Sequence, residues 1–211
     1  MNTDGLSDIA DGLRARLDAK HRAREQVLVL CREVIRLSAN AIRAVHRQEF
    51  DAAEELIAKG RANLQQADEA LAGHRDIFHA GFVHDAQKEY AEASCTLALV
   101  AGRPLPSPGD LGVMDPAYLN GLGETVGELR RHLLDSLRSG DIQHCEEALA
   151  AMGDIYDILV TMDYPEAVTA GLRRTTDAVR GILERTRGDF SMAYVQRHLE
   201  KKLDEFGKRL G

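Results

Sequence analysis

Apolar residues recur every three or four positions along most of the chain, the spacing of helices that bury one face. The first segment, from about Leu6 to His46, carries the clearest apolar series: Val27, Leu30, Val34, Leu37, Ala41 and Val45. This series predicts one long helix or two nearly continuous ones. The sequence contains no internal repeat and no convincing alternation of the kind that strands show. We therefore predict an all-α bundle of about seven helices in a single domain, residues 1–211.

Residues typical of helix ends divide the rest of the chain. The predicted helices begin at Asp51 (with Glu54 at capping-box spacing), Asp85, Asp115-Pro116, Asp141, Pro165 and Ser191. Two of these helices are predicted to end at glycines, Gly140 and Gly188. The remaining breaks are a stretch rich in Gly and His at 72–82 and a long loop at 102–116 that holds four of the five prolines.

Charge and cysteine content narrow the class of protein. The formal net charge is −7 and the pI is near 5.6, which argues against a general basic nucleic-acid binder but leaves room for a local positive surface. Cys31, Cys95 and Cys145 form no CxxC pair and are predicted to be buried free thiols in a reducing compartment. No apolar stretch reaches membrane-spanning length, and the N-terminus is too polar for a signal peptide. We expect a cytoplasmic protein with no membrane partner.

Four glutamates form two short pairs on different predicted helices: Glu89 with Glu92, and Glu124 with Glu128. Spacings of three and four place the carboxylates of each pair on one helix face. Carboxylate oxygens are hard ligands that hold Mg²⁺ or Mn²⁺ beside a phosphate, so convergence of the four would create a divalent-metal site. Glutamate is also a common residue of solvated helix faces, and spacing alone leaves that alternative open.

The second pair lies almost opposite the apolar stripe of its own helix. That stripe is Leu119, Leu122, Val126, Leu129, Leu133 and Leu137. The pair would face water in a monomer, or an active site if another helix or a second subunit covered that face.

Arginines recur along the polar flank of the first helix: Arg24, Arg32, Arg36, Arg43 and Arg47. Guanidinium groups suit phosphate oxygens, so this set is a candidate nucleic-acid contact within a cavity. The alternative is a solvated helix face whose arginines pair with neighbours such as Glu25 and Glu33.

The order of these elements resembles the translin family, which includes translin and translin-associated factor X. The resemblance covers the chain from about Arg24 onward. Its motifs are RxxVLxLCREVIRLSANAIRAVHR, QKEYAEAS and DPAYLNGLGETVGELRRHLLDSLRSGD. The second motif resembles the Glu-Tyr-x-Glu-Ala stretch of the factor X branch. The third follows the family pattern Tyr-Leu-x-Gly-x-x-Asp-x-x-Gly-Glu-Leu, although Glu124 stands where that pattern has Asp.

The resemblance implies a seven-helix subunit that assembles into a hollow, barrel-like homo-octamer and binds single-stranded RNA, with single-stranded DNA as a further ligand. In the factor X branch, inward-facing carboxylates hold Mg²⁺ and cleave single-stranded RNA. Glu89 and Glu92 match the first acidic pair and Glu128 matches a later Glu. The extra methylene of Glu124 could shift a metal ion by about 1 Å, enough to weaken an octahedral Mg²⁺ site.

Three functions follow from these observations. The first is a metal-dependent endoribonuclease in which Glu89, Glu92, Glu124 and Glu128 are metal ligands and catalytic residues, with Mg²⁺ or Mn²⁺ as the cofactor. The second is a non-catalytic RNA- or DNA-binding protein of the translin type. The third is a helical scaffold with acidic surfaces.

Overall fold

The computed structural model describes residues 3–210, with side chains as far as Lys208, and every regular element in that part of the chain is a helix. The six long helices are α1 (Leu6–His46), α2 (Phe50–Ala70), α4 (Gly81–Val100), α6 (Asp115–Ser139), α7 (Ile142–Val160) and α9 (Leu172–Leu210). The three single-turn helices are α3 (Arg75–Phe78), α5 (Pro108–Leu111) and α8 (Glu166–Thr169). The prediction of an all-α fold is confirmed.

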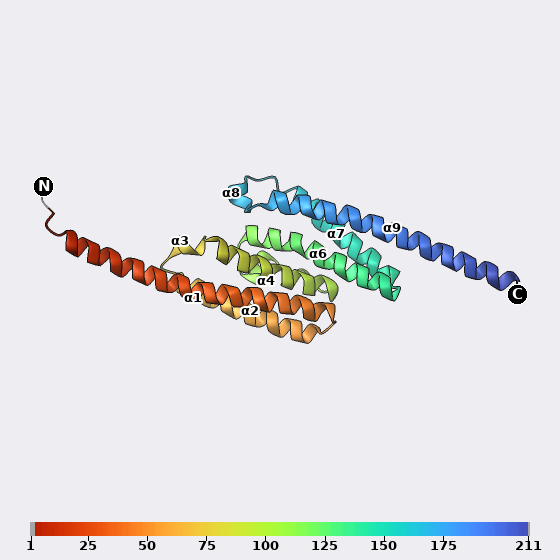
Figure 1. Cartoon of the computed structure of the whole chain (residues 1–211), viewed down its shortest axis with the longest axis horizontal. Helices are drawn as coiled ribbons and strands as arrows, with labels where there is room; N and C mark the ends of the chain where they lie inside the picture. The colour runs from red at the N-terminus through yellow and green to blue at the C-terminus, as the bar shows by residue number, and fades with distance from the viewer. Residues whose placement is uncertain (1–2, 211) are drawn as a thin grey trace.

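The long helices form successive layers (Figure 1). α1 and α2 pack against each other on one side, α4 and α6 lie in the middle, and α7 and α9 lie on the other side. α4 contacts α1 and α2 as well as α6, and α6 also contacts α7 and α9. The beginning of α1 and the end of α9 extend past the bundle in opposite directions. The α4–α6 contact is therefore the centre of the subunit.

Several predicted helix ends agree with the structure and others do not. α1 is one continuous helix, α6 ends at Gly140 in a left-handed conformation (φ 89°), and Asp141 caps α7 by accepting a hydrogen bond from the backbone N–H of His144. The predicted cap at Asp51 is wrong, because α2 already begins at Phe50 without a side-chain cap. α4 begins at Gly81, four residues before the predicted start at Asp85.

The break predicted at Gly188 is also wrong, because α9 continues through it. Glycine inside a helix costs only about 1 kcal/mol relative to alanine, which a long helix tolerates. Ser191 caps nothing: its hydroxyl donates to the carbonyl oxygen of Arg187 at 2.8 Å, as serines in helix interiors do. Pro165 instead precedes the single turn of α8.

A glycine on α6 permits the close approach of α4 and α6. A Cβ atom added to Gly121 would lie 2.5 Å from the carbonyl oxygen of Lys88 and 3.0 Å from the backbone nitrogen of Glu92. Real Cβ atoms are not found at the shorter distance, so any other residue here would separate the helices. Beside this contact, the hydroxyl of Thr125 donates to the carbonyl oxygen of Gly121 at 3.0 Å. The glycine thus brings the two acidic helix faces together.

The three cysteines are buried and free, as predicted. In the part of the chain that the structure describes, no helix is both long enough and apolar enough to cross a membrane.

Candidate metal centre

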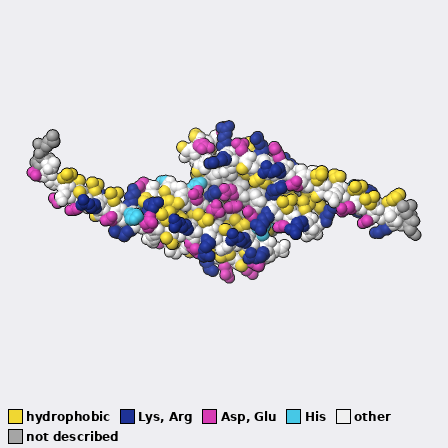
Figure 2. All heavy atoms as spheres, in the orientation of Figure 1, with side chains coloured by type: hydrophobic (Ala, Val, Ile, Leu, Met, Phe, Trp, Pro, Cys, Tyr) yellow, Lys and Arg dark blue, Asp and Glu magenta, His cyan; other side chains and the backbone are white. Residues whose placement is uncertain are grey.

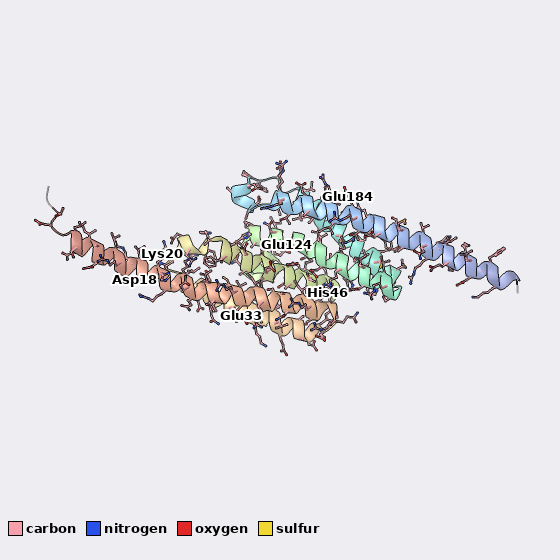
Figure 3. All side chains as sticks on the ribbon, in the orientation of Figure 1. Asp18, Lys20, Glu33, His46, Glu124 and Glu184 are labelled. Atoms are coloured by element: carbon pink, nitrogen blue, oxygen red, sulfur yellow. The ribbon has the colours of Figure 1, made fainter. Side chains whose placement is uncertain are left out.

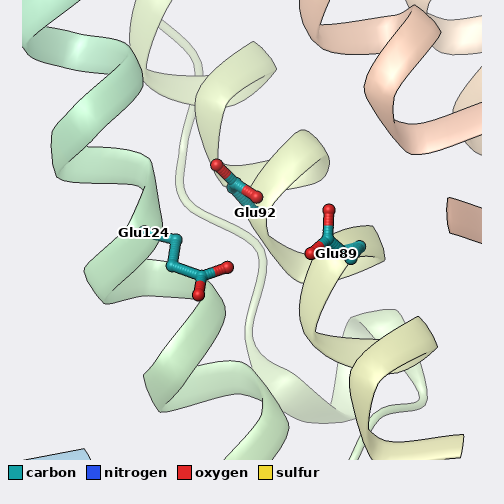
Figure 4. Close-up of side chains that lie close together, drawn as sticks. All are labelled: Glu89, Glu92 and Glu124. Carbon is teal, nitrogen blue, oxygen red and sulfur yellow. The ribbon is translucent and has the colours of Figure 1, made fainter. Parts of the chain in front are cut away.

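Three of the four predicted carboxylates meet between α4 and α6 (Figure 4). Glu89 and Glu92 extend from neighbouring turns of α4, and Glu124 extends toward them from α6. One oxygen from each carboxylate lies within 4.8 Å of the corresponding oxygen of the other two. The longer side chain at position 124 therefore does not prevent it from joining the group. We call Glu89, Glu92 and Glu124 the carboxylate centre.

Glu92 is the buried member of the carboxylate centre, with 9% of its surface exposed. Among the described residues, its carboxylate has no hydrogen-bond or ion-pair partner. Burial, together with the charges of Glu124, Glu89 and Glu128, raises the pKa of Glu92 to about 8, and Lys88 opposes this shift. A buried carboxylate beside two others is unfavourable when ionised, and a cation would relieve that cost.

Lys88 provides the nearest positive charge. Its ammonium donates to Glu124 Oε1 at 2.7 Å and lies 3.5 Å from Glu89 Oε1. Burial alone would lower the pKa of Lys88, but the hydrogen bond and charge of Glu124, with help from Glu89, raise it overall. Burial also raises the pKa of Glu89, although Lys88 opposes that shift. The carboxylate centre is thus partly neutralised from one side.

Glu128 lies outside the carboxylate centre, one turn along α6 from Glu124. Nε2 of His46, the last residue of α1, donates to Glu128 Oε2 at 2.5 Å. Only 5% of the His46 side chain is exposed, and Arg131 lies 4.0 Å from the same carboxylate oxygen. The hydrogen bond from His46 lowers the pKa of Glu128 despite burial. Figure 3 shows Glu124 near the middle of the bundle and His46 at the end of α1. The predicted set of four is therefore divided into a group of three and a separate hydrogen-bonded pair, Glu128 with His46.

The face of α6 opposite its apolar stripe is partly covered by other helices. The side chains of Glu124 and Glu128 are 37% and 25% exposed, because α4 lies against the first and the end of α1 against the second. Helices of the same subunit therefore cover part of this face, and the rest of it is exposed to solvent.

The five arginines are not part of the carboxylate centre. All five are exposed, and at roughly 100° per residue four of them lie opposite the buried seam of α1. Most pair locally: Arg24 with Glu25, Arg36 with Glu33, Arg43 with Asn40 and Arg47 with Glu49. In a single subunit the five arginines form a solvated face. Their role in nucleic-acid binding stays a prediction.

The donor set of the carboxylate centre suits a hard divalent cation. Three carboxylates supply only oxygen ligands, the type that Mg²⁺ and Mn²⁺ prefer, and one of the three residues, Glu92, is buried. Acidic side chains also gather at the middle of the face shown in Figure 2, where α4 and α6 lie in Figure 1. The residues present therefore fit such an ion.

Three contributors to this region were not predicted from the sequence. Lys88 is adjacent to Glu89, but nothing in the spacing predicts that it reaches Glu124 on another helix. His46, at the end of α1, carries no local signal that it would contact Glu128, since a basic residue at a helix C-terminus suits the helix dipole in any case. Gly121, three residues before Glu124, is the one with a usable signal, since glycine inside a strong helical pattern often marks a close helix approach.

Comparison with known proteins gives the lineage. No family model matches the chain. The chain is 30% identical over 193 residues to the uncharacterized protein MJ0175 of Methanocaldococcus jannaschii, covering 90% of this chain and 83% of that protein. The structure of AfC3PO in complex with duplex RNA superposes with a TM-score of 0.83 at 32% identity, covering 89% of this chain and 97% of that one. The structure of apo-NeC3PO, at 20% identity and a TM-score of 0.79, shares the fold.

The similarity to AfC3PO is one of sequence as well as shape, and it spans nearly the whole of both chains. It agrees with the motifs that run from the first long helix to the acidic stretch of α6. On these grounds the chain belongs to the translin family.

Proposed function

We propose that this protein binds RNA and cleaves it as a metal-dependent endoribonuclease. The observation that carries the proposal is the carboxylate centre, in which three carboxylate oxygens lie within 4.8 Å of one another and one residue is buried without a partner. Glu89, Glu92 and Glu124 would hold Mg²⁺ or Mn²⁺. The acidic set also favours the factor X branch of the family over translin itself.

The chain's own residues divide the work of the reaction. A bound divalent cation supplies charge neutralisation at the phosphate and a lowered pKa for its water. Glu92 must lose its proton to bind the cation, which its raised pKa opposes until the cation is present. Glu128, held ionised by His46 one turn from Glu124, is the candidate to accept a proton from the attacking group.

RNA is the substrate class that the family supports. AfC3PO forms a complex with duplex RNA, and its identity to this chain is 32%. We propose single-stranded RNA as the species cleaved, with single-stranded DNA as a further ligand. Binding without cleavage, as in translin, is the second candidate, and the competition between Lys88 and any metal ion at Glu124 is the observation that favours it.

Self-association into a homo-octamer is the assembly we propose. The projecting ends of α1 and α9 carry exposed apolar side chains: Leu6, Ile9, Leu13, Leu17, Met192, Val195, Leu199, Leu203 and Phe206. Such stripes on helices that extend past the bundle favour burial against other subunits. Light scattering should give a mass several times the 23.2 kDa of one chain, and a monomer at micromolar concentration would contradict the assembly.

Cleavage is tested with end-labelled single-stranded and duplex RNA, each incubated with Mg²⁺, Mn²⁺ or EDTA. We expect metal-dependent cleavage of the single strand by the parent protein and its loss in Glu92→Gln. Retention of RNA without cleavage in any metal would support the translin-like alternative. If the protein neither binds nor cleaves RNA, the result would support the scaffold function.

A further inference from the structure

Lys88 occupies one side of the carboxylate centre. Its ammonium is 2.7 Å from an oxygen of Glu124 and 3.5 Å from an oxygen of Glu89, so it contacts two of the three residues that would hold a cation. Its side chain is only 21% exposed, which limits the other positions it can take. Glu92, the third member, has no ion-pair partner among the described residues.

This arrangement places a positive charge of the protein where a metal ion would need its ligands. A cation bound by Glu124 and Glu89 must either displace the ammonium from their oxygens or tolerate it a few ångströms away. Displacement loses the ion pairs of Lys88, and if the ammonium stays, two positive charges lie close together in a partly buried site, so both cost free energy. The effect is specific to Lys88, since no other ammonium or guanidinium in the described residues pairs with these three carboxylates.

We propose that Lys88 is a tethered counter-ion that competes with the divalent cation for Glu124 and Glu89, and so sets the metal concentration at which the carboxylate centre fills. This inference rests on the proposed metal site. In the absence of metal the ammonium holds the α4 and α6 carboxylates together, and the arriving cation takes over that role. Removing the ammonium therefore strengthens metal binding, whereas loss of a purely structural ion pair between α4 and α6 would weaken it.

The test is direct titration of the full-length protein with Mn²⁺, following free Mn²⁺ by electron paramagnetic resonance at constant ionic strength. Lys88→Met removes the charge and keeps an unbranched side chain, and Lys88→Gln is a second neutral variant in case the first folds poorly. We expect the apparent Kd for Mn²⁺ to fall roughly tenfold or more in both. Lys88→Arg keeps the charge and should remain close to the parent.

The matched control is Lys59→Met, which removes the same charge from an exposed position on α2. It should change the Kd by less than about twofold, because Lys59 pairs with none of the three carboxylates and solvent screens an exposed charge. Suppose that the parent binds one Mn²⁺ ion and that Glu92→Gln abolishes this binding. An unchanged or higher Kd in the neutral Lys88 variants would then overturn the competition by Lys88 but not the metal site. If even the neutral Lys88 variants bind no Mn²⁺, the proposed metal site fails as well.

Discussion

Two glutamates one turn apart on α6 each have a cationic or imidazole partner, but only Glu124 also faces other carboxylates. Glu128 has a dedicated partner in His46, and the hydrogen bond lowers its pKa. Glu124 faces Glu89 and Glu92, and the burial of Glu92 beside these charges raises the pKa of that residue to about 8. The fold thus gives Glu128 a partner of its own, whereas the three carboxylates of the carboxylate centre share one ammonium, that of Lys88. Crowded charges of one sign are typical of functional sites, which often reduce the stability of the folded protein.

Glu92→Gln should have the largest effect, because it removes a buried ligand charge while keeping side-chain volume. We expect RNA cleavage to fall roughly 10²-fold or more, since the carboxylate that a divalent cation needs is gone. Folding should be unchanged or slightly more stable, because less charge is crowded between α4 and α6. Rates with labelled RNA and thermal unfolding are the two measurements. A variant that cleaves as fast as the parent would remove Glu92 from the metal site.

The raised pKa of Glu92 also predicts an unusual dependence of stability on pH. In the unfolded chain this carboxyl has an ordinary pKa of 4.5, and in the folded protein about 8, so the folded state binds more protons between these values. Stability from this group is complete below pH 4.5 and is lost as pH rises toward 8, by an amount on the order of a few kcal/mol.

Thermal unfolding with EDTA at several pH values between about 5 and 8 measures this loss. Glu92→Gln should flatten the slope, and saturating Mn²⁺ should restore stability at the alkaline end, because a ligand that binds only the folded state stabilises it. Equal slopes for parent and variant would mean that Glu92 does not carry the excess charge.

Gly121→Ala tests whether the close helix approach creates the carboxylate centre. The new methyl group would collide with the Lys88 carbonyl oxygen, so we expect a loss of about 1–3 kcal/mol in unfolding free energy and weaker Mn²⁺ binding. Gly127→Ala is the matched control on the same helix, because a Cβ there meets nothing within 4 Å. It should stabilise the protein by about 0.5–1 kcal/mol. Similar effects from both substitutions would contradict the role of Gly121.

The helices were predictable from sequence because their signal is local and repeated. The apolar series of α1 and the Gly140-Asp141 boundary depend only on residues a few positions apart. Gly188 misled the prediction because a glycine ends a helix only when the chain adopts the left-handed conformation there, and tertiary packing decides that. The spacing of apolar residues did not predict which helices would pack against each other.

The acidic residues likewise followed local spacing where neighbours on one helix were concerned, but not where contacts between helices were concerned. Spacing placed Glu89 with Glu92 and Glu124 with Glu128 on common faces, and the family resemblance suggested that all four converge. Neither the spacing nor the resemblance predicted the hydrogen bond between His46 and Glu128, because that contact joins residues 82 positions apart. Long-range partners of this kind depend on the packing angle of α1 against α6, which no local spacing encodes.

The smallest predicted effect concerns the hydrogen-bonded pair of His46 and Glu128. A double-mutant cycle of His46→Ala and Glu128→Ala should give a coupling free energy of about 1–2 kcal/mol in unfolding, since a half-buried carboxylate loses its charged hydrogen bond. The exposed pair of His21 and Glu25, 3.9 Å apart, is the matched control and should couple by less than about 0.5 kcal/mol. Mn²⁺ affinity should change little in His46→Ala, because Glu128 lies outside the carboxylate centre. A large loss of affinity would instead make Glu128 a fourth ligand that His46 positions.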